Sequence, residues 1–208
     1  MKTLAILGAG GHGKVVADAA ICAGWSEIAF FDDSYASTCR VGPWNVVGTN
    51  AEFRLRAGDF EGVTVAIGDS RTRLAWIDES LIKSSNLVSI VHPFSYVSRH
   101  AQIGAGSMIL AGAVVNPFAR LGRGCIVNSG ATVDHDCELA DAVHVSPGAH
   151  LAGSVRVGTC SWIGIGASVR QGIAIGAHVI VGAGAAVVHD VMDGQTVVGV
   201  PARNRRAD

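Results

Sequence analysis

One aliphatic residue recurs at every sixth position through the second half of the chain. From Val91 to Val187, each of seventeen successive sixth positions is Val, Ile or Leu. A helix repeats every 3.6 residues and a strand every two, so neither produces a period of six. A parallel β-helix does, because each short strand turns one aliphatic side chain into a narrow core before the chain bends at a corner. The pattern therefore predicts a parallel β-helix.

Small residues occupy a second position of this repeat, four places after many of the aliphatic residues. They are Ala101, Ser107, Ala113, Ala119, Cys125, Ala131, Cys137, Ala149, Ser161, Ala167 and Ala185. We interpret them as a second inward site near a corner, where there is little room. If three hexads close one coil, residues 18 apart stack about 4.8 Å apart. The repeat then makes between five and six coils.

The first half lacks the repeat, and its aliphatic runs predict a small α/β domain. We expect strands at 3–7, 27–31, 63–67 and 87–90, and helices at 14–24 and 70–83. Ten of the twelve aromatic residues lie at or before Tyr96, so composition also separates the two halves. We therefore predict a Rossmann-like domain at 1–88 and a β-helix domain at 89–208.

Composition and charge exclude several classes of function. The chain has 208 residues, 16% of them charged, and a formal net charge of -1. It has no basic field to hold nucleic acid or an anionic membrane surface, and no apolar run long enough to span a bilayer. Its five Cys include no CxxC pair, which disfavours a disulfide framework or a structural zinc site. The N-terminus lacks the features of a signal peptide, so we expect a cytoplasmic protein.

A glycine-rich turn joins the first predicted strand to the first predicted helix. Gly8, Gly10 and Gly13 match G-x-G-x-x-G, and the acidic pair Asp32-Asp33 ends the next strand. Such a turn lets a pyrophosphate approach the backbone at the positive end of a helix. Fewer than ninety residues precede the repeat, which leaves room for one mononucleotide half and not for two. We favour a nucleoside diphosphate carrying a sugar, with dinucleotide binding and a purely structural turn as alternatives.

The repeat resembles that of the hexapeptide-repeat acyltransferases, and the chain from about Thr3 to Arg203 resembles the sialic acid O-acetyltransferase family. The motifs are GAGGHGKVVAD (8–18), FFDD (30–33), AIGDSRTR (66–73), NSGATVDHDC (128–137), HVSPGAHLAG (144–153) and GVPAR (199–203). That family includes bacterial N-acetyltransferases of nucleotide-linked 4-amino-4,6-dideoxy sugars. The resemblance implies a left-handed β-helix, a homotrimer, no metal, and acetyl-CoA bound between neighbouring β-helices.

The resemblance also implies which residues bind the two substrates. For the nucleotide sugar they are Gly11, His12, Gly13, Asp32, Asp33, Gly68 and Asn128, and for acetyl-CoA they are His144, Ile165 and Ala183. Ala183 stands where the family has a glycine, which weakens that assignment. Arg203, Arg205 and Arg206 follow the repeat, either to meet the CoA phosphates or as a solvated basic tail.

Asp134-His135-Asp136 places a histidine between two acids within the unbroken repeat. Acetyl transfer from a thioester to an amine requires the ammonium to lose a proton, and a histidine titrates in the right range. A carboxylate on the other ring nitrogen would orient the ring. The resemblance makes His135 the base and Asp136 its partner, although the adjacent Asp134 leaves the partner open. Gly153 lies 18 residues later and is predicted to hold the oxyanion with its N–H.

The working hypothesis is an N-acetyltransferase that uses acetyl-CoA and acts on a nucleotide-linked amino sugar. The first alternative is O-acetylation of sialic acid or another glycan hydroxyl. Another is a zinc enzyme of the carbonic-anhydrase kind, which needs three histidines converging between subunits; the spacing of His135, His144 and His150 is only suggestive of it. The last is a nucleotide-binding scaffold without turnover. Cys137 occupies a small inward position, so we expect a buried, inert thiol and direct transfer without an acyl-enzyme.

Overall fold

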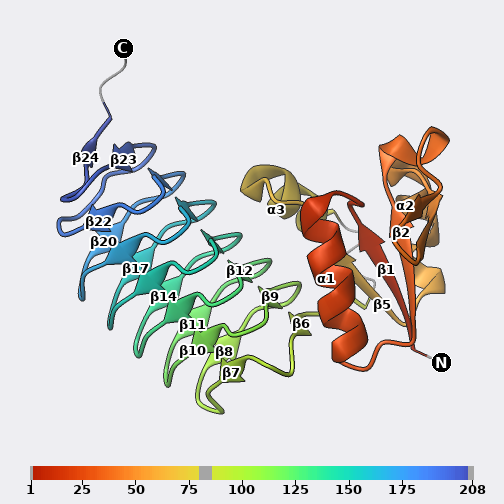
Figure 1. The fold of residues 1–208 in the computed structure, drawn as a ribbon, viewed down its shortest axis with the longest axis horizontal. Coiled ribbons are helices and arrows are strands. Elements are labelled where there is room, and N and C mark those ends of the chain that lie inside the picture. The colour runs from red at the N-terminus through yellow and green to blue at the C-terminus, as the bar shows by residue number, and fades with distance from the viewer. Residues whose placement is uncertain (1, 80–85, 206–208) are drawn as a thin grey trace.

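The computed structural model describes residues 2–79 and 86–205. An α/β domain is followed by a left-handed parallel β-helix, so the predicted fold class is confirmed. Figure 1 shows the coils stacked away from the α/β domain, with the first coil beside the helix α1 and the last near the C-terminus.

The α/β domain is built on a five-stranded sheet in the order β3-β4-β2-β1-β5. The strands are β1 (Thr3–Leu7), β2 (Glu27–Phe31), β3 (Arg40–Val41), β4 (Trp44–Gly48) and β5 (Gly62–Val65). The helices are α1 (Gly11–Cys22), α2 (Asn50–Arg56) and α3 (Ser70–Asp78), with 3-10 turns at Asp33–Ala36 and Ala57–Asp59. Only β3 runs antiparallel, against β4.

Several predicted boundaries in this domain were wrong. Helix α1 begins at Gly11, three residues early, because Gly10 is extended and serves as its N-cap. Helix α3 ends at Asp78, and residues 80–83 of the predicted helix lie outside the described residues. In place of a strand at 87–90, Leu87 makes an isolated bridge to Val63, and the first strand of the β-helix begins at Ile90.

Three sheets of two- or three-residue strands form the described part of the β-helix. The domain sheet comprises β6 (Ile90–Val91), β9 (Met108–Ile109), β12 (Ile126–Val127), β15 (His144–Val145), β18 (Trp162–Ile163), β21 (Ile180–Val181), β23 (Thr196–Val198) and β24 (Arg203–Asn204). The neutral sheet comprises β7 (Tyr96–Val97), β10 (Val114–Val115), β13 (Thr132–Val133), β16 (His150–Leu151), β19 (Ser168–Val169) and β22 (Ala186–Val187). The charged sheet comprises β8 (Gln102–Ile103), β11 (Arg120–Leu121), β14 (Glu138–Leu139), β17 (Arg156–Val157) and β20 (Ala174–Ile175).

The coils repeat every 18 residues, as the hexad pattern predicts. Val115 pairs with Val133 and Val133 with Leu151 in the neutral sheet. The aliphatic residues of the repeat are buried from Ile109 to Val187, while those of the first coil are partly exposed because no coil covers them below. The small inward residues from Ser107 to Ala185 are buried too, whereas Ala101 in the first coil is partly buried. Ser161 donates its hydroxyl to the carbonyl oxygen of Gly176 at a corner.

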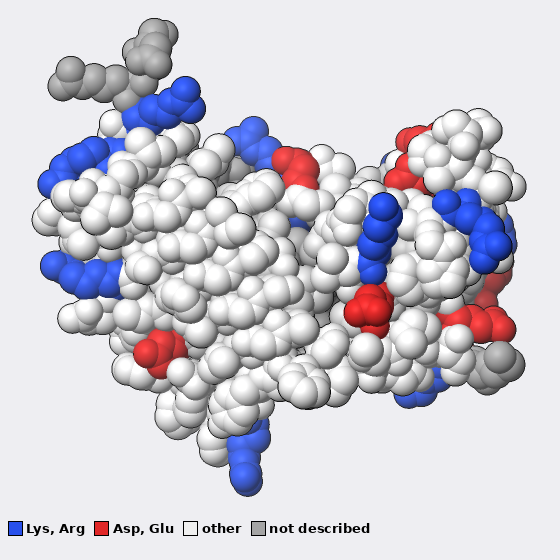
Figure 2. Space-filling view, in the orientation of Figure 1, with Lys and Arg blue, Asp and Glu red and all other residues white. Residues whose placement is uncertain are grey.

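The three sheets differ in what they turn outward. The domain sheet packs Ile90, Met108 and Ile126 against α1, so its lower half is buried under the α/β domain. The charged sheet points Arg120, Glu138 and Arg156 outward. The neutral sheet turns out residues without a formal charge: Tyr96, Val114, Thr132, His150, Ser168 and Ala186. In the view of Figure 2, uncharged surface covers most of the β-helix.

Candidate functional site

His135 lies in the corner between β13 and β14, where the chain leaves the neutral sheet. Its Nδ1 is 2.8 Å from the Asp136 carboxylate. Asp134 does something else, because its Oδ1 accepts the His135 backbone N–H at 2.8 Å and the Asn116 amide at 2.8 Å. The turn passes through Asp136 at a φ of 58°, a conformation that short polar residues tolerate better than most. Asp136 therefore contacts the ring, and Asp134 holds the backbone.

The surroundings of His135 make its ring more basic. The side chains of His135 and Asp136 are 58% and 55% exposed. Two effects raise the pKa of His135 above its ordinary value. The larger is the hydrogen bond that the ring makes to the Asp136 carboxylate, and the next is the negative charge of Asp134. When Nδ1–H donates to Asp136, the neutral ring keeps its lone pair on Nε2, which is the atom free to accept a proton.

Gly153 lies directly against the His135 ring. A Cβ at Gly153 would lie 2.6 Å from both Cε1 and Nε2 of His135, far inside contact distance. Only glycine leaves room for the ring in this position. The Gly153 N–H finds no acceptor among the residues that the structure describes. The oxyanion role stays a prediction, whereas the need for space beside the ring was not foreseen from the sequence.

Two further histidines lie close together, His12 in helix α1 and His144 in strand β15 of the domain sheet. His144 stacks on Trp162 with ring centroids 4.7 Å apart, and the His12 ring centroid is 6.3 Å from that of His144. His144 Nε2 lies 3.2 Å from the Asn128 amide nitrogen, and His12 Nε2 lies 3.2 Å from the Met108 sulfur. The structure thus brings one predicted acetyl-CoA residue together with two predicted nucleotide-sugar residues.

These two histidines are neutral at physiological pH. Burial, reinforced by the positive charge of Arg73, lowers the pKa of His12 to about 4. Burial lowers the pKa of His144 to about 3, with Arg73 and His12 adding to the effect. His144 Nδ1 is buried and has no hydrogen-bond partner among the described residues. Neither ring is suited to accept a proton during turnover.

The glycine turn closes tightly on itself. A Cβ at Gly13 would lie 2.1 Å from the Gly8 carbonyl oxygen, so the helix can approach the strand only with glycine there. Gly8 itself has a φ of 101°. Gly10, Gly11 and Gly68 instead face open space, which leaves the N-terminal N–H groups of α1 accessible.

The two acids of the pair accept hydrogen bonds from different elements, Asp32 from the glycine turn and Asp33 from the start of α2. Asp32 accepts the Ala9 N–H at 2.8 Å and the Ser34 hydroxyl at 2.7 Å. Asp33 accepts the Asn50 backbone N–H at 2.9 Å and the Asn50 side-chain amide at 2.8 Å. Their predicted contacts with a nucleotide sugar are untested, but both carboxylates already have a structural role.

A cavity of about 350 Å³ opens beside the turn. Ala9, Gly10 and Asp32 line it, together with Lys14 and Arg40. Neither basic residue was among those predicted to bind the nucleotide sugar. Lys14 stood inside the glycine motif and offered a signal, whereas Arg40 reaches the cavity only because β3 folds back against β4.

His144, Ile165 and Ala183, the residues predicted to contact acetyl-CoA, line one cavity of about 560 Å³. Trp162 and Ile180 share it and make its wall mostly apolar. Trp162 was not selected from the sequence, although it is one of two aromatic residues after Tyr96. The cavity follows the edge at which the domain sheet turns into the neutral sheet.

The predicted base and the predicted acetyl-CoA residues lie on opposite edges of the neutral sheet. Ile165 and Ala183 belong to the corners that enter this sheet, whereas His135 and Gly153 belong to the corners that leave it. A single chain therefore does not bring the two groups together.

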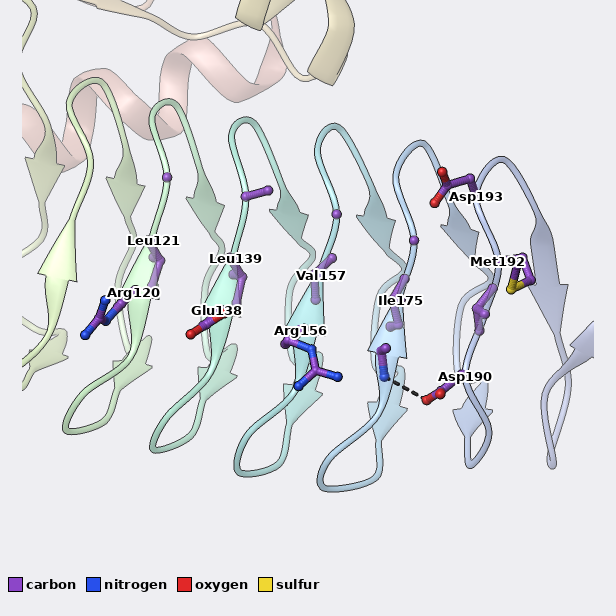
Figure 3. Close-up of a pocket in the computed structure, with 16 residues that line it drawn as sticks. Arg120, Leu121, Glu138, Leu139, Arg156, Val157, Ile175, Asp190, Met192 and Asp193 are labelled. Atoms are coloured by element: carbon purple, nitrogen blue, oxygen red, sulfur yellow. Dashed lines mark hydrogen bonds between the residues drawn. The ribbon is translucent and has the colours of Figure 1, made fainter.

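Another cavity, of about 980 Å³, lies on the outer face of the charged sheet. Figure 3 shows Arg120, Glu138 and Arg156 in a row along this face, and Asp190 bonded to the Ala174 N–H. It contains none of the predicted site residues.

Other predictions concerned metals, membranes and cysteine. No group of three or more His, Cys, Asp or Glu side chains within residues 2–79 and 86–205 is arranged to hold a metal ion. His144 and His150 lie on different sheets and His135 lies at a corner. Within the same ranges, no helix combines the length and apolar character needed to cross a bilayer. Cys137 is fully buried, and burial raises the pKa of its thiol to about 11, so it is inert.

Comparison with protein families matches both halves of the chain. Residues 3–80 match the PglD N-terminal domain, and residues 100–135 match the bacterial transferase hexapeptide family. The UDP-N-acetylbacillosamine N-acetyltransferase of Bacillus subtilis (strain 168) is 37% identical over 113 residues. That alignment covers 53% of this chain and 52% of the relative, so it spans about half the length of each.

Two solved structures match along nearly the whole chain. The acetyltransferase domain of PglB from Neisseria gonorrhoeae FA1090, in complex with acetyl coenzyme A, is 43% identical with a TM-score of 0.94 and covers 98% of this chain and 99% of that chain. A histidine-to-alanine variant of GDP-perosamine N-acetyltransferase from Caulobacter crescentus, in complex with CoA and GDP-perosamine, is 35% identical with a TM-score of 0.92 and covers 100% of this chain and 98% of that chain. The sialic acid O-acetyltransferase label stays a prediction. The chain therefore belongs to the family of hexapeptide-repeat sugar N-acetyltransferases with a PglD N-terminal domain.

Proposed function

We propose that this protein transfers the acetyl group of acetyl-CoA to the 4-amino group of a nucleotide-linked 4-amino-4,6-dideoxy sugar. One observation carries the proposal: the basic His135 ring, held by Asp136, lies over a glycine with a free N–H. Proton acceptor and oxyanion donor are the two groups that direct acyl transfer to an amine requires. The predicted cytoplasmic location suits a reaction that consumes acetyl-CoA.

In the proposed reaction the free amine attacks the thioester carbonyl carbon. A C–N bond forms, the C–S bond breaks, and CoA leaves as its thiolate. The proton lost by the nitrogen passes to His135 Nε2, and Asp136 stabilises the resulting imidazolium. The N–H of Gly153 donates to the oxyanion that develops on the carbonyl oxygen. Cys137 takes no part because its thiol is buried.

The nucleotide sugar is assigned to the α/β domain. The N–H groups at the start of α1 and the basic side chains of Lys14 and Arg40 offer a site for its diphosphate. The sugar then extends past His12 and Asn128. The pantetheine arm of acetyl-CoA is assigned to the apolar cavity between His144 and Ala183.

The proposed active form is a homotrimer formed through the neutral sheet. The outward residues of this sheet carry no formal charge, so packing them together desolvates no ion, unlike burial of the charged sheet. In three-fold packing about the neutral sheet, the corners that leave the sheet in one protomer lie beside the corners that enter the sheet in the next. His135 of one chain then faces the acetyl-CoA cavity of its neighbour, which supplies the juxtaposition that one chain lacks.

A thiol-release assay tests the activity. Purified protein with acetyl-CoA is offered UDP-, GDP- and dTDP-linked 4-amino-4,6-dideoxy sugars, with sialic acid as the comparison acceptor. We expect CoA release with one of the amino sugars and none above background with sialic acid. Release with sialic acid alone would support the O-acetyltransferase alternative, and absence of release with every acceptor would support the scaffold.

A further inference from the structure

Arg73 is buried completely between the two domains, although it carries a charge. It belongs to α3, and its side chain has no exposed surface. A guanidinium has five N–H donors, and here all five are used. They reach the carbonyl oxygens of Ile67, Gly68, Gly124 and Ala142 and the hydroxyl of Ser70, over distances of 2.7 to 3.2 Å.

These acceptors come from two places that are remote in the sequence. Ile67 and Gly68 form the loop after β5 and precede α3. Gly124 and Ala142 belong to corners of the β-helix that lead into β12, which Asn128 follows, and into β15, which begins with His144. One side chain thus fixes the position of the loop relative to the buried histidines.

The loop that Arg73 holds lies beside the glycine turn. Strands β1 and β5 are parallel neighbours, so the turns that follow them emerge at the same edge of the sheet. A Cβ at Gly8 would lie 2.9 Å from the Ala66 carbonyl oxygen, which places the two turns in contact. A displacement of the loop would therefore reach the N-terminus of α1.

All five partners of Arg73 are neutral, so no carboxylate bonded to it compensates its charge. Burial lowers the pKa of Arg73 only to about 10, which leaves it a cation at neutral pH. Its charge acts on His12 in the first turn of α1 and on His144. Apolar residues can join two domains without burying a cation, so the retained charge calls for a further role.

We propose that Arg73 is a positioning residue for the nucleotide sugar, which locks the Ile67–Gly68 loop onto the β-helix and makes the site at the start of α1 more favourable for a diphosphate. The inference rests on the proposed nucleotide-sugar substrate. It assigns Arg73 no contact with substrate. Its effect is on binding of the nucleotide sugar, and neither on binding of acetyl-CoA nor on the chemical step.

Kinetics of two variants test this. Arg73→Met removes both the positive charge and the hydrogen-bond donors of the guanidinium, whereas Arg73→Lys keeps the charge and loses part of the hydrogen bonding. We expect Arg73→Met to raise the KM for the nucleotide sugar at least about tenfold, with Arg73→Lys between it and the wild type. The KM for acetyl-CoA and kcat should stay within about twofold of the wild-type values. Arg71→Met is the matched control, because Arg71 is exposed on the same helix.

Binding and exchange measurements keep the test separate from the activity. Calorimetry with UDP or GDP alone should show at least about tenfold weaker binding by Arg73→Met than by the wild type. Hydrogen exchange of the free protein should show faster exchange at residues 66–69 in Arg73→Met and unchanged exchange in β1 and β2. Arg71→Met should match the wild type in both measurements.

The outcomes separate this inference from the proposed function. If the wild type binds a nucleoside diphosphate but turns over no amino sugar, the proposed activity fails while the calorimetric comparison still decides the role of Arg73. Unchanged diphosphate binding and loop exchange in a folded Arg73→Met would overturn the inference. An equal rise in both KM values would also overturn it, and so would a wild type that binds no nucleoside diphosphate.

Discussion

Histidines at two places in this protein have opposite electrostatic surroundings. His135 is exposed at a corner of the β-helix, and neighbouring carboxylates raise its pKa. His144 is buried and His12 is half-buried beside Arg73, and their pKa values fall to about 3 and about 4. The same side chain is therefore an exposed ring with a raised pKa in one place, where we propose a proton acceptor, and a neutral, packed ring in the other.

The surroundings of each histidine decide the direction in which its pKa moves, and therefore which roles its ring is suited to. A general base needs a suitable pKa and an accessible ring, and His135 has an exposed ring whose pKa is raised by Asp136. A ring whose pKa lies far below neutrality still offers shape, stacking and one N–H donor. Four substitutions or pairs of substitutions test this contrast, and they follow in order of decreasing expected effect.

Removing the exposed ring should have the largest effect. His135→Ala is expected to lower kcat at least about 10²-fold, because the amine loses its proton acceptor. The KM values for both substrates should change little. His178→Ala is the control, since His178 is an exposed corner histidine between the charged and domain sheets. Turnover of His135→Ala near the wild-type rate, measured by thiol release, would remove His135 from the mechanism.

Filling the space beside the ring should have the next largest effect. In Gly153→Ala the new methyl group collides with the His135 ring and displaces it. We expect kcat to fall at least about tenfold, since small misplacements of a catalytic group are costly. Gly58→Ala is the control because a Cβ at Gly58 meets open space. Full activity of Gly153→Ala would contradict the close contact between ring and glycine.

Replacing each of the two acids with asparagine should separate their roles through the pH dependence of kcat/KM. His135 must be neutral to accept a proton, so activity should rise with pH through its raised pKa. Asp136→Asn removes the largest cause of that rise, and the acid limb of kcat/KM should move to lower pH, with a lower plateau. Asp134→Asn should move the limb less, because its amide oxygen can still accept the His135 N–H. An equal shift in both variants would show that charge alone matters.

The buried histidines should be visible in stability rather than in rate. Their folded pKa values lie below the unfolded value of 6.5, so the unfolded state binds more protons and the free energy of unfolding falls as pH drops below 6.5. The slope should reach about 1.4 kcal/mol per pH unit for each histidine. Urea unfolding between pH 7 and about pH 4.5 should show a smaller slope in His144→Gln and no such reduction in His135→Gln. An unchanged slope in His144→Gln would argue against a buried neutral ring.

Much of the β-helix follows from its sequence because the repeat is local. The aliphatic residues of the repeat from Ile109 to Val187 all lie in the core. One six-residue period therefore accounts for the strands, the corners and the pairing of residues 18 apart. The α/β domain was less predictable. Strands β3 and β4 and helix α2 lie within residues 40–56, where the sequence shows no hydrophobic period that predicts them. They depend instead on the pairing of β4 with β2.

The coil architecture follows from the repeat in the sequence, and the exceptions to the repeat predict the candidate reactive residues. The tertiary structure decided which acid meets the His135 ring, why residue 153 is glycine, and that His12 and His144 share one buried cluster with Arg73. These facts depend on distances between residues as far apart in the sequence as His12 and His144, and on removal of water, neither of which a linear motif encodes.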